Sequence, residues 1–154
     1  MKQQQKMASK SKNKGTTPEL NSVKFVEGSL WTASVLNAVK DTPNVIKKIK
    51  EFQEVKSKNP MAPYGTNDRP FASTGLYKQY LPKAMKAHLT PDISVVYELS
   101  GRNPTIIRLY GVFTHADMGT GQPPNKNVQK SMAARLSNSF NENLEVFFNK
   151  LLKE

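Results

Sequence analysis

Hydrophobic and polar positions alternate with two different periods along this chain of 154 residues, and the changes of period mark the expected elements. Residues 21–27 alternate in the way a short strand does. Residues 28–40 and 43–52 place their apolar side chains at helical spacing, and Pro43 suits the first turn of the second helix. The N-terminal part therefore predicts one strand followed by a pair of helices.

The middle of the chain predicts two further strands between loops. Residues 57–75 are rich in Pro, Gly, Asn and Ser, which indicates a loop, and a short interrupted segment covers 76–85. The alternation in 92–99 predicts a half-buried strand, and 105–113 predict a second strand that pairs with it antiparallel across a tight turn. Residues 114–125 predict another loop.

A long helix is predicted at the C-terminal end, from about residue 127 to 153. Its apolar stripe consists of Val128, Met132, Leu136, Phe140, Leu144, Phe147 and Leu151. Packing of this stripe on the sheet is favoured over binding of a partner helix. The order of elements predicts an α+β fold: a small antiparallel sheet with helices on one side, an N-terminal helical pair and an added C-terminal helix.

The first 20 residues differ from the rest by their Lys, Gln and Ser content. They cannot bury enough apolar surface to offset the entropy of ordering, so 1–20 predict a disordered basic tail. Its lysines could contact phosphates or have no role. Residues 21–154 then predict one domain, with 126–154 as its C-terminal helix.

Charge and composition narrow the function classes. The chain has 23 Lys and Arg against 12 Asp and Glu, a formal net charge of +11, which favours a polyanionic partner and nucleic acid first. The alternative is a basic protein whose surplus lysines only keep it in solution. The absence of cysteine excludes disulfides, thiolate metal sites and cysteine nucleophiles.

We expect neither a metal nor a cofactor, because two histidines are few for a histidine-rich metal site. No apolar run approaches the length of a membrane span, and the basic N-terminus lacks the apolar core of a signal peptide. A cytoplasmic location is therefore the expectation.

The candidate chemistry lies at the ends of the two central strands. His88 and Asp92 stand just before the first, and His115 stands just after the second. If these strands form a hairpin, their outer ends meet, and both histidines of the chain converge with a carboxylate on one edge of the sheet.

Two imidazoles and a carboxylate on a basic surface suit cleavage of RNA. One group can take the proton of a 2′-hydroxyl while another protonates the leaving 5′-oxygen, and both roles are open to histidine near neutral pH. Nearby cations would stabilise the charge on phosphorus. Two alternatives stay open: surface histidines without a role, and Asp92 as an acceptor for a backbone amide in the turn.

The same residues resemble a pattern of the RelE/YafQ-type toxins, small bacterial ribonucleases that cut mRNA on the ribosome. The resemblance covers about residues 22–119, and its motifs lie within 86–119. They consist of Ala87-His88, Pro91-Asp92 and Tyr97 around the first strand and Thr114-His115 at the end of the second. The resemblance implies a RelE-like fold and an endoribonuclease that acts in the ribosomal A site.

By position, the resemblance implies catalytic roles for His88, Asp92 and His115. Arg69 stands where the family has a further histidine; arginine is no ordinary base, but it can bind phosphate. The RNA- or phosphate-binding residues expected from charge and position are Arg108, Lys78, Lys83, Lys86, Lys47 and Lys48.

Two further departures from the family pattern concern RNA contacts. Met118 occupies the place of an aromatic residue that would stack on a base. An arginine common in the family is replaced in the region 111–112, and Arg108 on the same strand could compensate for it.

The expected partners are mRNA, the ribosome and an acidic antitoxin protein that covers the basic face. Two rival functions remain. One is a non-catalytic protein that binds RNA, the ribosome or DNA on the same fold, and Arg69 in place of a histidine supports it. The other is a structural or protein-interaction module that uses the C-terminal helix.

Overall fold

The computed structural model describes residues 23–71, 75–100 and 104–153, with side chains described up to residue 140. The predicted tail and part of the hairpin turn lie outside these residues, so the prediction of a disordered tail and of one domain over 21–154 stays a prediction. The described elements are β1 (Lys24–Glu27), α1 (Trp31–Asp41), α2 (Val45–Lys58), β2 (Asp68–Pro70), α3 (Gly75–Tyr80), β3 (Ala84–His88), β4 (Ile93–Ser100), β5 (Ile106–Thr114), α4 (His115–Met118) and α5 (Lys126–Lys153).

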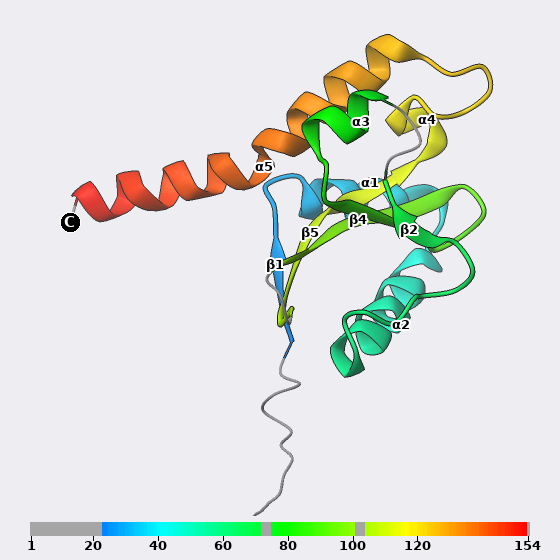
Figure 1. Cartoon of the computed structure of the whole chain (residues 1–154), viewed down its shortest axis with the longest axis horizontal. Coiled ribbons are helices and arrows are strands. Elements are labelled where there is room, and N and C mark those ends of the chain that lie inside the picture. The colour runs from blue at the N-terminus through cyan, green and yellow to red at the C-terminus, as the bar shows by residue number, and fades with distance from the viewer. Residues whose placement is uncertain (1–22, 72–74, 101–103, 154) are drawn as a thin grey trace, which may run out of the picture.

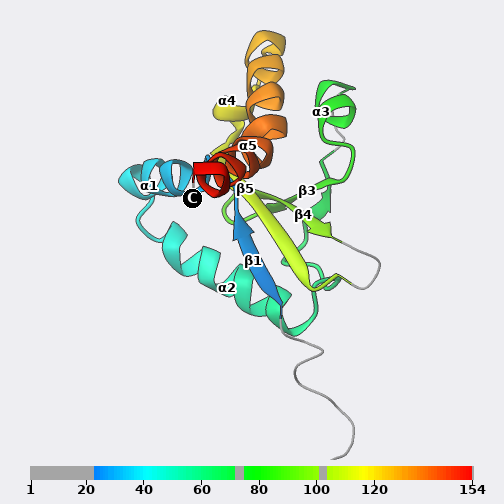
Figure 2. The ribbon, with the colours of Figure 1, turned by 90° about the vertical axis from the view of Figure 1, so that its left-hand side faces the viewer.

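One five-stranded sheet with the order β1-β5-β4-β3-β2 forms the centre of the fold. The α+β class predicted from the sequence is confirmed. The predicted hairpin is confirmed as well, because β4 and β5 pair antiparallel, with a bulge between Val96 and Tyr97. The sheet is mixed, since β1 pairs parallel with β5 at the edge (Figure 2). β1 is joined to β5 through most of the fold rather than by a tight turn, and a tight turn is what imposes an antiparallel direction.

Two strands lie in segments that the sequence predicted as a loop and an interrupted stretch. β2 pairs antiparallel with β3, and β3 pairs antiparallel with β4. Both strands are short, with three and five residues. A strand of this length shows too few alternating positions to be recognised, and Pro70 at the edge is a residue that usually signals a loop.

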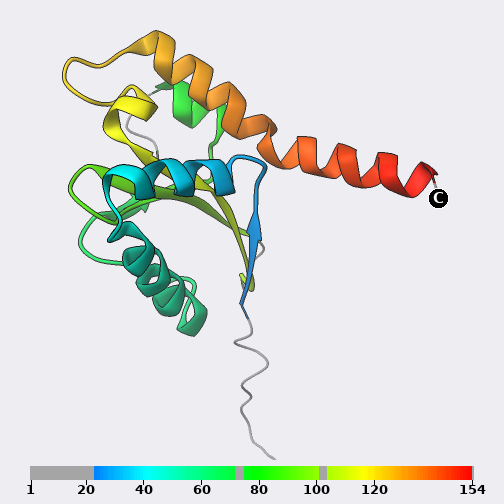
Figure 3. The same ribbon diagram turned by 180° about the vertical axis from the view of Figure 1, so that it is seen from behind.

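Helices cover both faces of the sheet, which corrects the predicted arrangement with helices on one side (Figures 1 and 3). Ile93, Val95 and Tyr97 pack into one apolar cluster with residues of α1 and α2. Val96 packs into a second cluster with α3 and α5, so β4 is buried on both faces and not half-buried. In that second cluster the α5 side chain Leu136 is fully buried, which confirms packing for the described part of the predicted stripe.

A short helix, α4, begins where a loop was predicted. The hydroxyl of its N-cap residue Thr114 accepts the backbone N–H of Asp117 at 3.0 Å, and the Asp117 carboxylate accepts the backbone N–H of Thr114 at 3.0 Å. This reciprocal capping box starts the helix. Gly119 ends it with a φ of +71°, a conformation that favours glycine. The Thr-x-x-Asp spacing was the sequence signal for this helix.

The second half of α5 extends away from the rest of the molecule (Figures 1 and 3). The predicted stripe residues Leu144, Phe147 and Leu151 fall in this half, and their side chains lie outside the described ones. Within the ranges that the structure describes, no helix has the length and apolar character needed to cross a membrane.

Candidate active site

The start of β4 and the end of β5 bring the two histidines and Asp92 together, as the hairpin predicted. Ile93 is opposite Thr114 in the strand register, which places the residues flanking this pair side by side. The ring Nδ1 of His115 lies 3.1 Å from the Asp92 Oδ1. The rings of His88 and His115 meet edge to face, with centroids 5.8 Å apart and an angle of 82° between their planes.

Asp92 orients the His115 ring. Its Oδ1 accepts the backbone N–H of His115 at 3.3 Å and faces the ring Nδ1, which therefore carries a hydrogen. This leaves Nε2 of the ring for proton exchange. The backbone turn next to Asp92 uses a different acceptor, since the Thr90 hydroxyl accepts the backbone N–H groups of Asp92 and Ile93 at 3.2 and 2.9 Å. Asp92 thus accepts a backbone amide, as the alternative proposed, but that amide belongs to His115 and not to the turn next to Asp92.

His88 is the last residue of β3 and has positively charged neighbours. Partial burial lowers the pKa of His88 from its ordinary value of 6.5, and the charges of Lys86, His115 and Arg69 lower it further. His88 is thus held in the neutral form at neutral pH, and a neutral imidazole can accept a proton.

Lys86 and Arg69 lie across from each other on β3 and β2. The Lys86 ammonium stands 5.4 Å from the centroid of the Phe71 ring, and burial, followed by the charge of Arg69, lowers the pKa of Lys86. The Arg69 guanidinium donates a hydrogen bond to the Asn67 side-chain oxygen. Because side chains two apart on a strand share a face, Lys86 and His88 lie on the same face of the sheet. Two cations beside a neutral histidine suit a phosphate group.

Arg108, another of the predicted RNA-binding cations, lies away from the histidine pair. Arg108 forms an ion pair with Glu98 at 3.8 Å and lies on β5 six residues before Thr114, the residue that precedes His115, which is about 20 Å at roughly 3.3 Å per residue. Arg108 therefore does not compensate for the missing family arginine at this site. Gly111 explains the absence of that arginine, because the Phe113 ring occupies the space that a side chain at this position would need.

The remaining predicted lysines divide between the two faces of the sheet. Lys47 and Lys48 belong to α2, which packs on the face opposite Lys86, and Lys48 pairs with Glu51 at 3.9 Å. Lys78 on α3 and Lys83 just before β3 are exposed. These two stand nearer in the chain to Lys86 and are better placed to extend its positive surface.

A buried polar network, which the sequence did not reveal, anchors β2. The Lys56 ammonium is 2.7 Å from the Asp68 carboxylate, and the two side chains are 2% and 1% exposed. The Tyr97 hydroxyl donates to the other Asp68 oxygen, and the backbone N–H of Tyr64 donates to Asp68 at 2.8 Å. Tyr97, a residue of the family pattern, therefore has a structural role. The only sequence signal of this buried network was Lys56, a lysine that continues the apolar stripe of α2.

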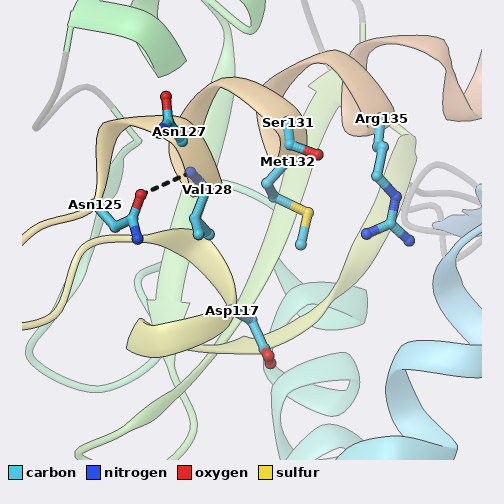
Figure 4. A pocket seen from close by; sticks show the side chains of 7 residues that line it. All are labelled: Asp117, Asn125, Asn127, Val128, Ser131, Met132 and Arg135. Carbon is cyan, nitrogen blue, oxygen red and sulfur yellow. Dashed lines mark hydrogen bonds between the residues drawn. The ribbon is translucent and has the colours of Figure 1, made fainter.

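A separate cavity of about 280 Å³ lies between α4 and the first turns of α5 (Figure 4). Of its polar side chains, Asp117 caps α4, and the Asn125 side-chain oxygen accepts the backbone N–H of Val128 at 3.1 Å. Both caps stabilise helix ends, so this cavity belongs to the corner between the two helices. In the described part of the chain, no three His, Asp or Glu side chains are grouped to hold a metal ion.

Comparison with known proteins returned solved structures only; no protein-family model and no curated protein matches the chain. The crystal structure of the E. coli DinJ-YafQ complex is similar at 20% identity over 61% of this chain and 94% of that chain, with a TM-score of 0.49. The YoeB/ParE toxin from Agrobacterium tumefaciens is similar at 15% identity over 60% of this chain and 99% of that chain, with a TM-score of 0.48.

YafQ from E. coli strain BL21(DE3) is similar at 19% identity over 61% of this chain and 94% of that chain, with a TM-score of 0.49. Two of these structures contain YafQ, and the third is a YoeB/ParE toxin. Likenesses of this size concern the course of the chain and not its chemistry.

Proposed function

We propose that this protein is an endoribonuclease that cleaves RNA by general acid and base catalysis with His88 and His115. The observation that carries the proposal is the edge-to-face contact of the two rings at 5.8 Å, with cations around one ring and a carboxylate on the other. Two titratable groups in opposite surroundings are what an acid and a base need in order to work at one pH.

In the proposed reaction, the 2′-oxygen of a ribose attacks the adjacent phosphorus, and neutral His88 takes the 2′-hydroxyl proton. The bond between phosphorus and the 5′-oxygen breaks, and the Nε2–H of protonated His115 gives its proton to that oxygen. The products are a 2′,3′-cyclic phosphate and a 5′-hydroxyl. Arg69 and Lys86 hold the phosphate and stabilise its developing charge, and Asp92 keeps the His115 ring in place.

The proposal includes a substrate and a protein partner. Messenger RNA in the ribosomal A site is the proposed substrate, supported by the net charge of +11 and by the toxin-like motifs around the histidines. An acidic antitoxin is the proposed protein partner, in analogy to the DinJ-YafQ complex. Lys78 and Lys83 are proposed to contact the RNA backbone beyond the reacting phosphate.

The test is induced expression of the chain followed by mapping of mRNA 5′ ends. We expect new 5′-hydroxyl ends in the wild type and a loss of at least about 100-fold for His115→Ala or His88→Ala. Lys58→Ala, which removes an exposed cation on α2, is the matched control and should cut like the wild type. Undiminished cutting by either histidine variant, with the fold checked by circular dichroism, would overturn the assignment.

A non-catalytic RNA-, ribosome- or DNA-binding protein is the second candidate, and it is favoured by Arg69, which stands in place of a third histidine and lies opposite Lys86. This function predicts salt-dependent RNA binding that persists in a variant with alanine at both histidines, together with no cleavage by the wild type.

A further inference from the structure

An open groove of about 690 Å³ adjoins the histidine pair on the side of His88. One wall is the segment 64–67 that leads into β2, and the other is the segment 88–91 at the turn between β3 and β4. His88 lines the groove and also contacts the His115 ring. A molecule bound in the groove would therefore reach the proposed reaction site directly.

The first wall of the groove is held rigidly. The Tyr64 ring meets Phe52 edge to face at 5.7 Å, and its hydroxyl donates to Glu51 at 3.2 Å. The backbone N–H of Tyr64 is bound to the buried Asp68 carboxylate. Gly65 follows with a φ of +72°, which allows the chain to turn at the rim of the groove. A fixed aromatic ring beside an open space is a surface on which a flat ring can stack.

On each wall, one polar side chain has a donor available to a ligand. The Asn67 side-chain oxygen is taken by Arg69 and its backbone oxygen by the His88 N–H at 3.4 Å, so the side-chain NH₂ is the group left to interact with a ligand. On the opposite wall, the Thr90 hydroxyl oxygen already accepts two backbone N–H groups and has its own hydrogen to donate. A ligand that presents acceptors from a flat ring would satisfy both walls.

The geometry points to this groove as a subsite for one nucleobase of the RNA, that of a nucleotide next to the phosphate held by Arg69 and Lys86. This inference rests on the proposed function, because the position of the phosphate comes from it. A free phosphate or a peptide fits less well, since an aromatic ring and neutral donors line the groove rather than a cluster of charges.

The donors also predict which bases are accepted. Uracil and guanine present carbonyl oxygens, whereas adenine and cytosine present an amino group at the corresponding edge. Donors at Asn67 and Thr90 would meet an acceptor in the first pair and another donor in the second. We therefore expect the groove to prefer uracil or guanine.

The experiment measures dissociation constants by fluorescence anisotropy, with tetranucleotides that carry 2′-deoxyribose throughout and so cannot be cut at any of their three phosphates. Each of the four bases is placed in turn on either side of the central phosphate. For the wild type, we expect binding to be about fivefold or more tighter with uracil or guanine than with adenine at one of the two positions.

Asn67→Asp is the decisive variant, because it keeps an oxygen for Arg69 and replaces the amide donor with an acceptor. It should abolish the preference, and Asn67→Ala, which adds no charge, should reduce it. Asn127→Asp makes the same change on an exposed residue that lines the separate cavity, and it should keep the preference. Tyr64→Phe, which keeps the ring, should also keep it.

Equal affinities for all four bases in the wild type would overturn the subsite, as would an Asn67→Asp variant that behaves like Asn127→Asp. A different result would contradict the proposed function. A base preference at the groove without any cleavage of ordinary RNA would refute the nuclease and leave the subsite, whereas cleavage by a wild type without base preference would refute only the subsite.

Discussion

His88 and His115 contact each other, yet the regions around them are opposite in charge. His88 ends β3, beside the cations Lys86 and Arg69, and its pKa is lowered by burial and by these charges. His115 begins α4, with the Asp92 carboxylate 3.1 Å from its Nδ1. Burial and the cations thus keep the His88 imidazole neutral and able to accept a proton, whereas the carboxylate gives the His115 ring a partner for its N–H.

The two regions also differ in how they are held. The region of His88 depends on buried side chains, because Lys56, Asp68 and Tyr97 anchor β2 under it. The region of His115 depends on short local contacts at the surface, namely the capping box of α4 and a carboxylate that is 65% exposed. The first should therefore be sensitive to changes in the core, and the second to changes in single surface groups.

The largest effect is expected from Asp68→Asn, which breaks the anchor of the His88 region and leaves Lys56 buried without its counter-charge. Removing one partner of a buried ion pair costs about 3–5 kcal/mol, so the free energy of unfolding should fall by about that amount. Urea denaturation followed by circular dichroism measures it. Lys58→Ala, which breaks an exposed pair, is the control, and a loss below about 1 kcal/mol for Asp68→Asn would show that the anchor is not needed.

A smaller effect is expected from Asp92→Asn in the other region. The pair with His115 is partly exposed, so its loss should cost up to about 1 kcal/mol, equivalent to about a fivefold lower rate of RNA cleavage, with little change in stability. Single-turnover cleavage of a model RNA measures the rate. Glu54→Gln removes an exposed carboxylate on α2 and should leave the rate unchanged. Equal rates for wild type and Asp92→Asn would remove Asp92 from the mechanism.

The smallest effect is the shift expected in the titration of His88 in Lys86→Met, which removes the cation that acts most strongly on His88 and keeps an apolar stem beside Phe71. The pKa of His88 should rise toward 6.5, as measured by NMR titration of the imidazole ring, and the loss of cleavage at acid pH should begin at a higher pH. Lys83→Met is the exposed control. An unchanged His88 titration in Lys86→Met would show that burial and the charges of His115 and Arg69 lower the pKa of His88 without Lys86.

The same shift links the His88 region to stability. Because the pKa of His88 is lower in the folded protein than the ordinary 6.5, the unfolded chain binds a proton first as the pH falls below 6.5. His88 should therefore reduce the stability of the folded state between pH 6.5 and its own lower pKa. The reduction should be smaller in Lys86→Met, and urea denaturation at pH 7.5 and 5.5 compares the two.

Much of the fold could be predicted because periodic patterns are local. The two central strands, the helical pair and the C-terminal helix each show enough repeats of their period to be recognised. The gathering of His88, Asp92 and His115 followed from one hairpin, because its turn sets which residues are opposite. The strands β2 and β3 were missed, since three and five residues carry too little periodicity.

The sequence by itself determined the α+β class, the hairpin that unites the two histidines, and a charge suited to RNA. Only the tertiary structure decided which side of that pair is cationic, because Arg69 comes close to His88 through the pairing of β2 with β3. It also decided that Lys56 is buried with Asp68, that Arg108 lies far from the site, and that a groove opens beside His88. Burial and distance between remote segments arise from packing, and no local pattern records them.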